Sequence, residues 1–226
     1  MNHNTILFTH KGVEQENCKD VCQFKDLENA TIISLADGVS SKKRATLGAS
    51  KVQTDIALML ANETELSNLS DEQIGYRIAN TICKSIDCLA ENKKCEKTDF
   101  ASTLMMGIFP EQADFYWTIH IGDGIIGIVD KNEDIKVLSA PQNGITKQYT
   151  YTTVSKDLFK KIRVKKYNER GSVFFMTDGI TNEIFKEEKS RKEYVEIIKK
   201  TDWSGLEKRL LDDGARDDIG FCCIEF

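Results

Sequence analysis

Four short acidic motifs, each next to an apolar run, constrain the fold of this chain more than any other feature. They are Asp37-Gly38, Gly122-Asp123-Gly124, Asp178-Gly179 and Asp217-Asp218. The first three follow an apolar run and the last precedes one, and short apolar runs of this kind are typical of buried strands. We therefore expect carboxylate groups at the ends of several buried strands.

Each motif alone predicts only a turn, because Asp and Gly are residues that tight turns favour. Several together need a further explanation, since like charges repel and a carboxylate is almost never fully buried without a partner. Oxygen ligands select hard divalent cations. The set therefore indicates a site for more than one Mg²⁺ or Mn²⁺ ion. Gly38 allows a sharp turn that brings its carbonyl to the same point as the Asp37 carboxylate.

These motifs, in this order and at these intervals, resemble the signature of the PP2C-type (PPM) metal-dependent serine/threonine protein phosphatases, specifically the compact bacterial branch. The resemblance runs from about Gly12 to the last residue. It implies an α+β sandwich, in which two antiparallel β-sheets pack face to face and helical layers cover both outer faces. It also implies a single domain over residues 1–226, with a flap or variable segment at about 139–170.

By this resemblance the chain is a hydrolase that removes phosphate from phosphoserine and phosphothreonine in proteins, through attack of a water molecule that bridges two Mn²⁺ or Mg²⁺ ions. Asp37 and Asp178 are the implied catalytic residues, and Asp37 bridges the two ions. The implied metal ligands are Asp20, Asp37, the Gly38 carbonyl, Asp178 and Asp217, with Asp123 at a third metal ion.

Several of these assignments rest on the resemblance, because the residues alone leave another interpretation open. Asp20 stands just before a strand, where a lone Asp is usually a solvated loop residue. Asp217 is preferred to Asp218 because the first member of the family's acidic pair is the ligand. Asp123 fits a hairpin turn as well as it fits a metal site. His120 is expected to be packed rather than to bind metal, since the family's metals are oxygen-bound.

The chain departs from the family pattern where the substrate phosphate is held. The family commonly has a basic residue where this chain has Gln15, and charge-assisted hydrogen bonds normally hold a phosphate dianion. Lys19 and Arg44 are the candidate replacements, with Lys11 as a third. The basic run 42–44 is either a solvated helix start or a rim that attracts phosphate. Further departures are Val39, in place of a His common in animal members, and Gly124-Ile125 in place of Ser-Arg.

These departures keep two alternatives open. One is a catalytically weak or inactive PP2C-like regulator that binds phosphoproteins. The other is a phosphomonoesterase acting on small molecules. Retained metal binding without turnover would favour the first, and a preference for nucleotides or sugars over peptides would favour the second.

Bulk properties limit the partners and the location. The net charge of −5 argues against nucleic acid. We find no apolar run of 18 residues and no signal peptide, which predicts that the chain has no membrane anchor. The seven cysteines form no zinc-binding spacing and fit reduced thiols, which favours the cytoplasm. The expected partner is a phosphoprotein substrate, in signalling that a Ser/Thr kinase opposes, and we expect a monomer.

Periodicity predicts the remaining organisation. Helices are expected at 45–60, 71–92, 180–185, 188–200 and 203–211. Strands at 101–109, 114–121, 125–130 and 134–138 are expected to form one antiparallel meander. The strand 219–226 should lie beside a central strand at 172–178. The polar stretch 139–170, with its basic run at 160–166, is either a solvated connection or a flap that attracts acidic phosphosegments.

Overall fold

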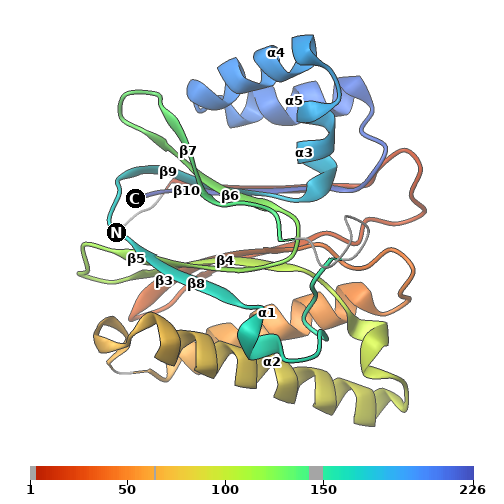
Figure 1. The fold of residues 1–226 in the computed structure, drawn as a ribbon, viewed down its shortest axis with the longest axis vertical. Helices are drawn as coiled ribbons and strands as arrows, with labels where there is room; N and C mark the ends of the chain where they lie inside the picture. Colours follow the sequence, from red (N-terminus) through yellow and green to blue (C-terminus); the bar gives the residue numbers. More distant parts are fainter. Residues whose placement is uncertain (1–3, 64, 143–149) are drawn as a thin grey trace.

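The computed structural model describes residues 4–63, 65–142 and 150–226. Two antiparallel sheets of five strands each pack face to face, and helices cover the outer face of each sheet (Figure 1). This four-layer arrangement confirms the predicted sandwich. It follows from the sequence because strands buried on both faces must read as nearly continuous apolar runs, and β3, β4 and β5 are buried along their whole lengths.

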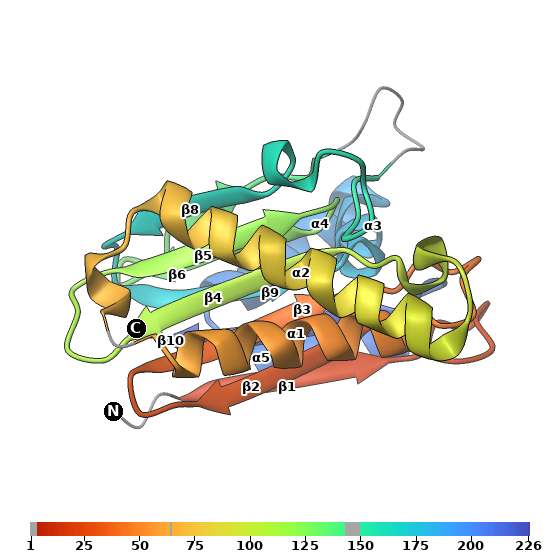
Figure 2. The ribbon, with the colours of Figure 1, turned by 90° about the horizontal axis from the view of Figure 1, so that it is seen from below.

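The first sheet has the strand order β2-β3-β4-β5-β8. Its strands are β2 (Val21–Asp26), β3 (Ala30–Ala36), β4 (Leu104–Pro110), β5 (Tyr116–Ile121) and β8 (Arg163–Tyr167). Two helices cover it, α1 (Ala45–Ala61) and α2 (Asp71–Lys93), and they cross the sheet side by side in Figure 2. A capping box between Ser70 and Gln73 sets the start of α2. Both helices were predicted, and they pack against each other over this one sheet.

The second sheet has the order β1-β10-β9-β6-β7. Its strands are β1 (Thr5–His10), β10 (Ile219–Glu225), β9 (Gly171–Met176), β6 (Ile125–Asp130) and β7 (Ile135–Ser139). The helices α3 (Asp178–Phe185), α4 (Glu188–Lys199) and α5 (Trp203–Asp213) lie over it. The central position of β9 and its pairing with β10 were both predicted. Short 3₁₀ turns complete the described chain: η1 (Leu66–Asn68), η2 (Lys97–Phe100) and η3 (Leu158–Lys160).

The predicted single meander is wrong. β4 and β5 form a hairpin in the first sheet, whereas β6 and β7 form a hairpin in the second. The chain crosses between the sheets at Gly122-Asp123-Gly124. Gly122 has φ +125°, and a Cβ there would lie 2.6 Å from the Thr103 side chain, so only glycine fits. The crossing carries Asp123 to the edge where the other acidic motifs lie.

The polar stretch 139–170 contains more regular structure than the sequence indicated. Residues 143–149, near the start of the predicted flap, lie outside the described residues. The part that follows forms η3 and then β8, an edge strand of the first sheet.

The cysteines are free thiols: Cys222 and Cys223 are buried, whereas Cys83 and Cys88 are exposed. In the described part of the chain, no helix is both long and apolar enough to span a membrane.

Candidate metal centre

Asp37 is fixed at the end of β3 by the residue that precedes β4. Its backbone amide donates to Thr103 Oγ1 at 2.8 Å, and its carbonyl accepts from the Thr103 amide at 2.8 Å. The Gly38 amide donates to the Lys19 carbonyl at 3.3 Å, and a Cβ on Gly38 would meet Ala45 Cβ at 2.9 Å. Both backbone groups of Asp37 are therefore satisfied, which leaves its carboxylate to face the space beyond the strand.

Asp20 lies behind Asp37 and is buried, with 6% of its surface exposed. Its Oδ2 accepts a hydrogen bond from the Thr177 hydroxyl at 2.8 Å, and that hydroxyl oxygen accepts from the Gly220 amide at 2.8 Å. Its Oδ1 is buried and has no hydrogen-bond partner. A buried carboxylate oxygen without a partner is costly unless a proton or a cation satisfies it.

Asp178 and Asp217 come from the ends of neighbouring strands. Asp178 opens α3, and Gly179 after it allows a close approach, since a Cβ there would lie 1.9 Å from the Asp218 carbonyl oxygen. Asp217 Oδ1 accepts from Gln15 Nε2 at 2.8 Å and from the Asp218 amide at 2.9 Å. Gln15, which replaces the family's basic residue, therefore orients a carboxylate.

Asp218 fixes a loop, whereas Asp217 lines the cleft. Its two carboxylate oxygens accept backbone amides, Gly12 at 3.0 Å and Lys19 at 2.7 Å. It is buried, whereas Asp217 is half-buried and lines a cleft. Asp218 thereby ties both ends of the loop 12–19 to the start of β10, next to Asp20.

A cleft of about 410 Å³ brings most of the predicted carboxylates together. Asp37, Asp123, Asp178 and Asp217 line it. The hydroxyl of Thr150 donates a hydrogen bond to Asp123 Oδ2, which ties Asp123 to a residue within the predicted flap. In residues 4–63, 65–142 and 150–226, no three carboxylate, imidazole or thiol groups form a complete cage for a metal ion. The four carboxylates of the cleft and the unpartnered Oδ1 of Asp20 nevertheless indicate a site for hard metal ions.

The electrostatics of the cluster favour a cation. Burial, together with the charges of Asp218 and Asp178, raises the pKa of Asp20 to about 8. Burial, together with the charges of Asp123 and Asp217, raises the pKa of Asp178 to about 6. The pKa of Asp37 is raised well above its ordinary value, first by burial and then by Asp20 and Asp178. Groups that resist ionisation because of their neighbours' charge fit a divalent cation, which removes that repulsion.

The candidate phosphate-binding residues Lys19 and Arg44 each contact another residue of the chain. Lys19 Nζ donates to the Ser40 carbonyl, and Arg44 pairs with Asp99 at 3.6 Å. Neither lines the cleft, whereas Lys42 does. Lys42 has no carboxylate partner among the residues that the structure describes. The sequence singled out the basic run 42–44, but only the path of the chain after Gly38 distinguishes Lys42 within it.

His120 is packed between the sheets, as predicted, and does not line the cleft. Arg163 Nη2 contacts His120 Nδ1 at 2.6 Å, and because a guanidinium can only donate, that nitrogen accepts. Ser139 Oγ lies 2.8 Å from the same nitrogen. Burial lowers the pKa of His120 from 6.5 to about 3, with a smaller contribution from the Arg163 charge.

We expect this buried neutral imidazole to make the protein acid-sensitive. Below pH 6.5 the unfolded chain binds a proton at His120 that the folded chain refuses, so stability falls as pH decreases from 6.5 toward about 3. The His120→Gln variant has no group at this position that titrates in this range. The unfolding free energy of wild type, relative to that of the variant, should therefore fall by about 1.4 kcal/mol for each unit by which the pH decreases in this window. Urea titrations at pH 6.5, 5.5 and 4.5 measure it, and parallel pH dependences for the two proteins would contradict it.

The chain matches a known protein family and known structures over most of its length. Residues 9–212 match the family model described as protein phosphatase 2C. No curated protein matches. Among solved structures, a serine/threonine phosphatase of S. agalactiae has a TM-score of 0.74 at 18% identity, with 99% of each chain covered. The phosphatase Stp1 of Staphylococcus aureus has a TM-score of 0.74 at 12% identity, covering 100% of this chain and 96% of Stp1.

A third similar structure is described as the catalytic domain of the serine/threonine protein phosphatase PstP in complex with two manganese ions. Its TM-score is 0.70 at 10% identity, with 99% of this chain and 97% of that chain covered. At such low identities these three structures establish a common fold. The match of residues 9–212 to the family model is separate evidence, and it bears on the family as well as on the fold.

Proposed function

Because the chain belongs to the protein phosphatase 2C family, and is therefore a metal-dependent serine/threonine protein phosphatase, we propose a ligand set for its cleft. Two divalent cations, Mn²⁺ or Mg²⁺, bind at Asp20, Asp37, the Gly38 carbonyl, Asp178 and Asp217, and a third binds at Asp123. The observation that carries this proposal is the buried, unpartnered Oδ1 of Asp20, together with the four carboxylate side chains that line the cleft.

When bound, divalent cations at such a site lower the pKa of water and neutralise charge on a phosphoryl group. The chain's own residues determine where this happens. Thr103 holds the backbone of Asp37, and Gln15 orients Asp217. Val39 lines the cleft without a proton to donate, so the departing serine or threonine oxygen takes its proton from water. Lys42, the one cationic residue among the described residues that line the cleft, holds the phosphate by a charge-assisted hydrogen bond.

The assay of phosphate release from a phosphothreonine peptide with Mn²⁺, Mg²⁺ or EDTA tests this function. We expect turnover with either metal and none with EDTA. A folded sample that binds Mn²⁺ in calorimetry but releases no phosphate would support the phosphoprotein-binding regulator instead. Faster hydrolysis of nucleotide or sugar phosphates than of phosphopeptides would support the small-molecule enzyme. No observation on the described residues favours either alternative.

We expect the Lys42→Gln substitution to weaken substrate binding. A hydrogen bond between charged groups contributes about 1.5 to 3 kcal/mol, so kcat/KM for a phosphopeptide should fall about 10- to 100-fold. Most of the loss should appear in KM, because the phosphate is charged before and during the reaction. The matched control is Lys43→Gln, an exposed neighbour that does not line the cleft. Equal kcat/KM for the two variants would exclude Lys42 from phosphate binding.

The remaining assignments belong to the same proposal. The enzyme acts as a monomer in the cytoplasm, on proteins that a Ser/Thr kinase phosphorylates, and its residues 1–226 form one domain with a flap at about 139–170. The tie between Thr150 and Asp123 supports the flap, because it joins that segment to the cleft.

A further inference from the structure

The charge of this chain is unevenly distributed. Residues 158–168 contain five cationic side chains and no acidic residue, although the chain has a net charge of −5. The five are Lys160, Lys161, Arg163, Lys165 and Lys166, which we call the basic strip. They belong to η3, to β8 and to the two residues between them. A local cluster of one sign in a chain of the opposite net sign points to a partner of complementary charge.

Carboxylates of the protein do not neutralise the basic strip. In the described part of the chain, none of its five members forms an ion pair. Lys161 Nζ lies 4.2 Å from the centre of the Tyr151 ring, and Lys166 Nζ lies 4.1 Å from that of Phe115. Aromatic faces therefore hold these ammonium groups in place without removing their charge. Arg163 is half-buried and donates to the Ala140 carbonyl at 2.6 Å.

β8 offers an open edge beside a groove. It is the outermost strand of its sheet in Figure 2, and β7 is the outermost strand of the other sheet. A groove of about 270 Å³ is lined by residues 136–138 of β7 and residues 165–169. In a strand successive side chains point to opposite faces, so Lys165 and Lys166 flank the free edge of β8 on both sides. Val137 in the groove is 52% exposed, and Lys136 pairs with Glu169.

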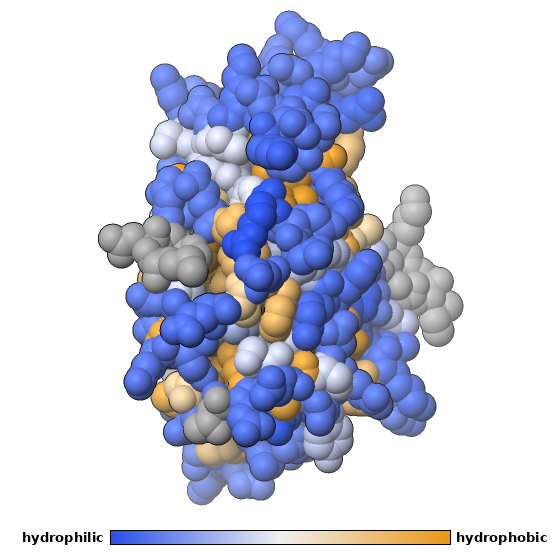
Figure 3. Space-filling model, turned by 90° about the vertical axis from the view of Figure 1, so that its left-hand side faces the viewer, coloured by the Kyte–Doolittle hydropathy of each residue, from blue (hydrophilic) through white to orange (hydrophobic). Residues whose placement is uncertain are grey.

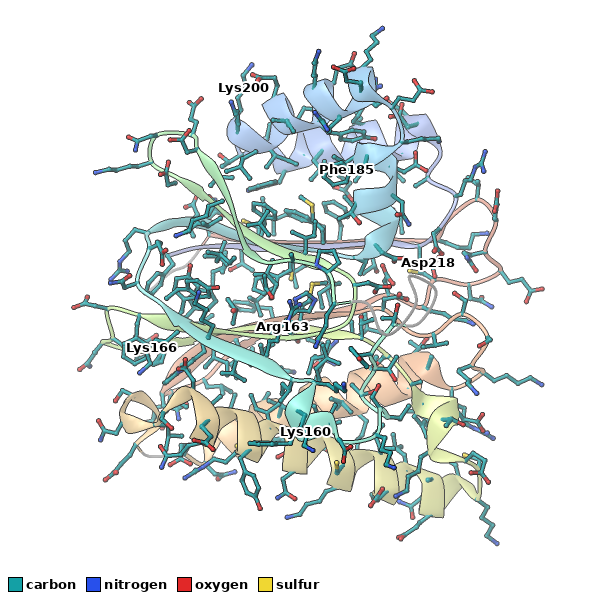
Figure 4. The ribbon with its side chains drawn as sticks, viewed as in Figure 1. Lys160, Arg163, Lys166, Phe185, Lys200 and Asp218 are labelled. Carbon is teal, nitrogen blue, oxygen red and sulfur yellow. The ribbon has the colours of Figure 1, made fainter. Side chains whose placement is uncertain are left out.

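The basic strip is continuous with the metal cleft. Thr150, Thr152 and Val154 line the cleft, and the chain then runs through η3 into β8. Figure 4 shows Lys160, Arg163 and Lys166 in that order along the segment, starting nearest the side on which Asp218 lies and ending toward the opposite side. An extended chain whose phosphate sits in the cleft can therefore follow the basic strip along the edge of the sandwich.

We propose that the basic strip and the groove between β7 and β8 bind an extended acidic segment of the phosphoprotein substrate, several residues from the phosphorylated one. This inference rests on the proposed function. Exposed strand edges are a common docking place for extended peptides, and the lysines supply complementary charge. The competing explanation is that Lys165 and Lys166 merely protect an edge strand from aggregation.

Another cleft lies where β9 begins and β10 ends, opposite the acidic residues of the metal cleft, and its lining has mixed charge. Its volume is about 460 Å³, and it is lined by Lys131, Arg170, Lys199 and Lys200 but also by Asp130, Glu133 and Glu225. Figure 3 shows this end as mainly hydrophilic, with apolar residues scattered over it. Its mixed charge gives no preference for an acidic partner. Lys199 and Lys200 therefore serve as a control pair, because they are adjacent lysines outside the basic strip. Figure 4 labels Lys200, which lies far from Lys166.

The experiment compares two phosphothreonine peptides in the Mn²⁺-loaded protein. One carries four Glu residues placed about five to ten positions from the phosphothreonine on either side, and the other carries Gln there. We expect wild type to have at least a fivefold higher kcat/KM for the acidic peptide, through a lower KM. The Lys165→Ser/Lys166→Ser protein should lose this preference, whereas Lys199→Ser/Lys200→Ser should keep it. Hydrolysis of p-nitrophenyl phosphate, which is too small to reach β8, should be equal in all three.

The outcomes separate the two proposals. Absence of hydrolysis of both phosphothreonine peptides and of p-nitrophenyl phosphate by wild type would overturn the proposed function itself. Hydrolysis without a preference for the acidic peptide would overturn the docking inference alone. A preference that survives in Lys165→Ser/Lys166→Ser would also overturn it, and aggregation of this protein with the preference intact would identify the lysines as edge protection. Loss of the wild-type preference in 0.5 M NaCl is the remaining expectation, because exposed charges are screened.

Discussion

The Asp37→Asn protein should release phosphate from a phosphothreonine peptide about 10³-fold more slowly than wild type with Mn²⁺, while its fold stays intact. The amide removes a charge that is expected to hold the metal ions. A metal site contributes several kcal/mol to stabilising a phosphoryl transition state, so its loss slows the reaction strongly. The backbone of Asp37 makes both of its hydrogen bonds to Thr103 whatever its side chain, so β3 should remain in place. Initial rates measure the loss of turnover, and circular dichroism measures whether the fold stays intact.

The control for Asp37 is Asp212→Asn, an exposed Asp at the end of α5 that does not line the cleft. It loses the same charge elsewhere and should keep wild-type turnover. A folded Asp37→Asn protein that retains most of its activity with Mn²⁺ would remove Asp37 from the catalytic centre.

Divalent cations should raise the melting temperature of wild type by about 8 to 16 °C over its value in EDTA. A ligand that binds only the folded state, at 1,000 times its dissociation constant, stabilises by about 4 kcal/mol, and each kcal/mol shifts Tm by about 2 to 4 °C in a chain of this size. The physical source is relief of the repulsion among Asp20, Asp37 and Asp178. Thermal unfolding with Mn²⁺, Mg²⁺ and EDTA measures it without reference to activity.

The Asp20→Asn variant is the matched test of that shift. Its amide carbonyl can still accept from Thr177, but the buried anionic oxygen is lost. The metal-dependent rise in Tm should shrink to less than half, whereas Asp212→Asn should show the full rise. An undiminished rise in Asp20→Asn would place the bound metal away from Asp20.

The family resemblance implied the sandwich and the cleft residues, and local patterns were consistent with both. Apolar runs marked the strands, and an acidic residue at the end of a strand lies at an edge of the sheet. The change of sheet between β5 and β6 could not be predicted in this way. Gly122-Asp123-Gly124 reads as a hairpin turn, and only the space next to Thr103 decides that the chain turns away from β4.

Other features were hidden because they depend on where a side chain points. Lys42, Lys43 and Arg44 look alike in the sequence, yet only Lys42 lines the cleft. β8 was not predicted because most of its side chains are polar, which is characteristic of an edge strand rather than of a buried one. Thr103 and Gln15 carry no sequence signal for their roles, since each acts by positioning an Asp that is distant in the sequence.

The place of β10 has a consequence for how the enzyme is made. β10 lies between β1 and β9, so that Thr5 pairs with Ile224 and Phe221 with Met176. Pairing between strands so far apart in the sequence is slow. Asp178 and Asp217, which lie at the ends of β9 and β10, therefore come together only when β10 inserts between β1 and β9. Activity should therefore appear in one step, with the insertion of β10.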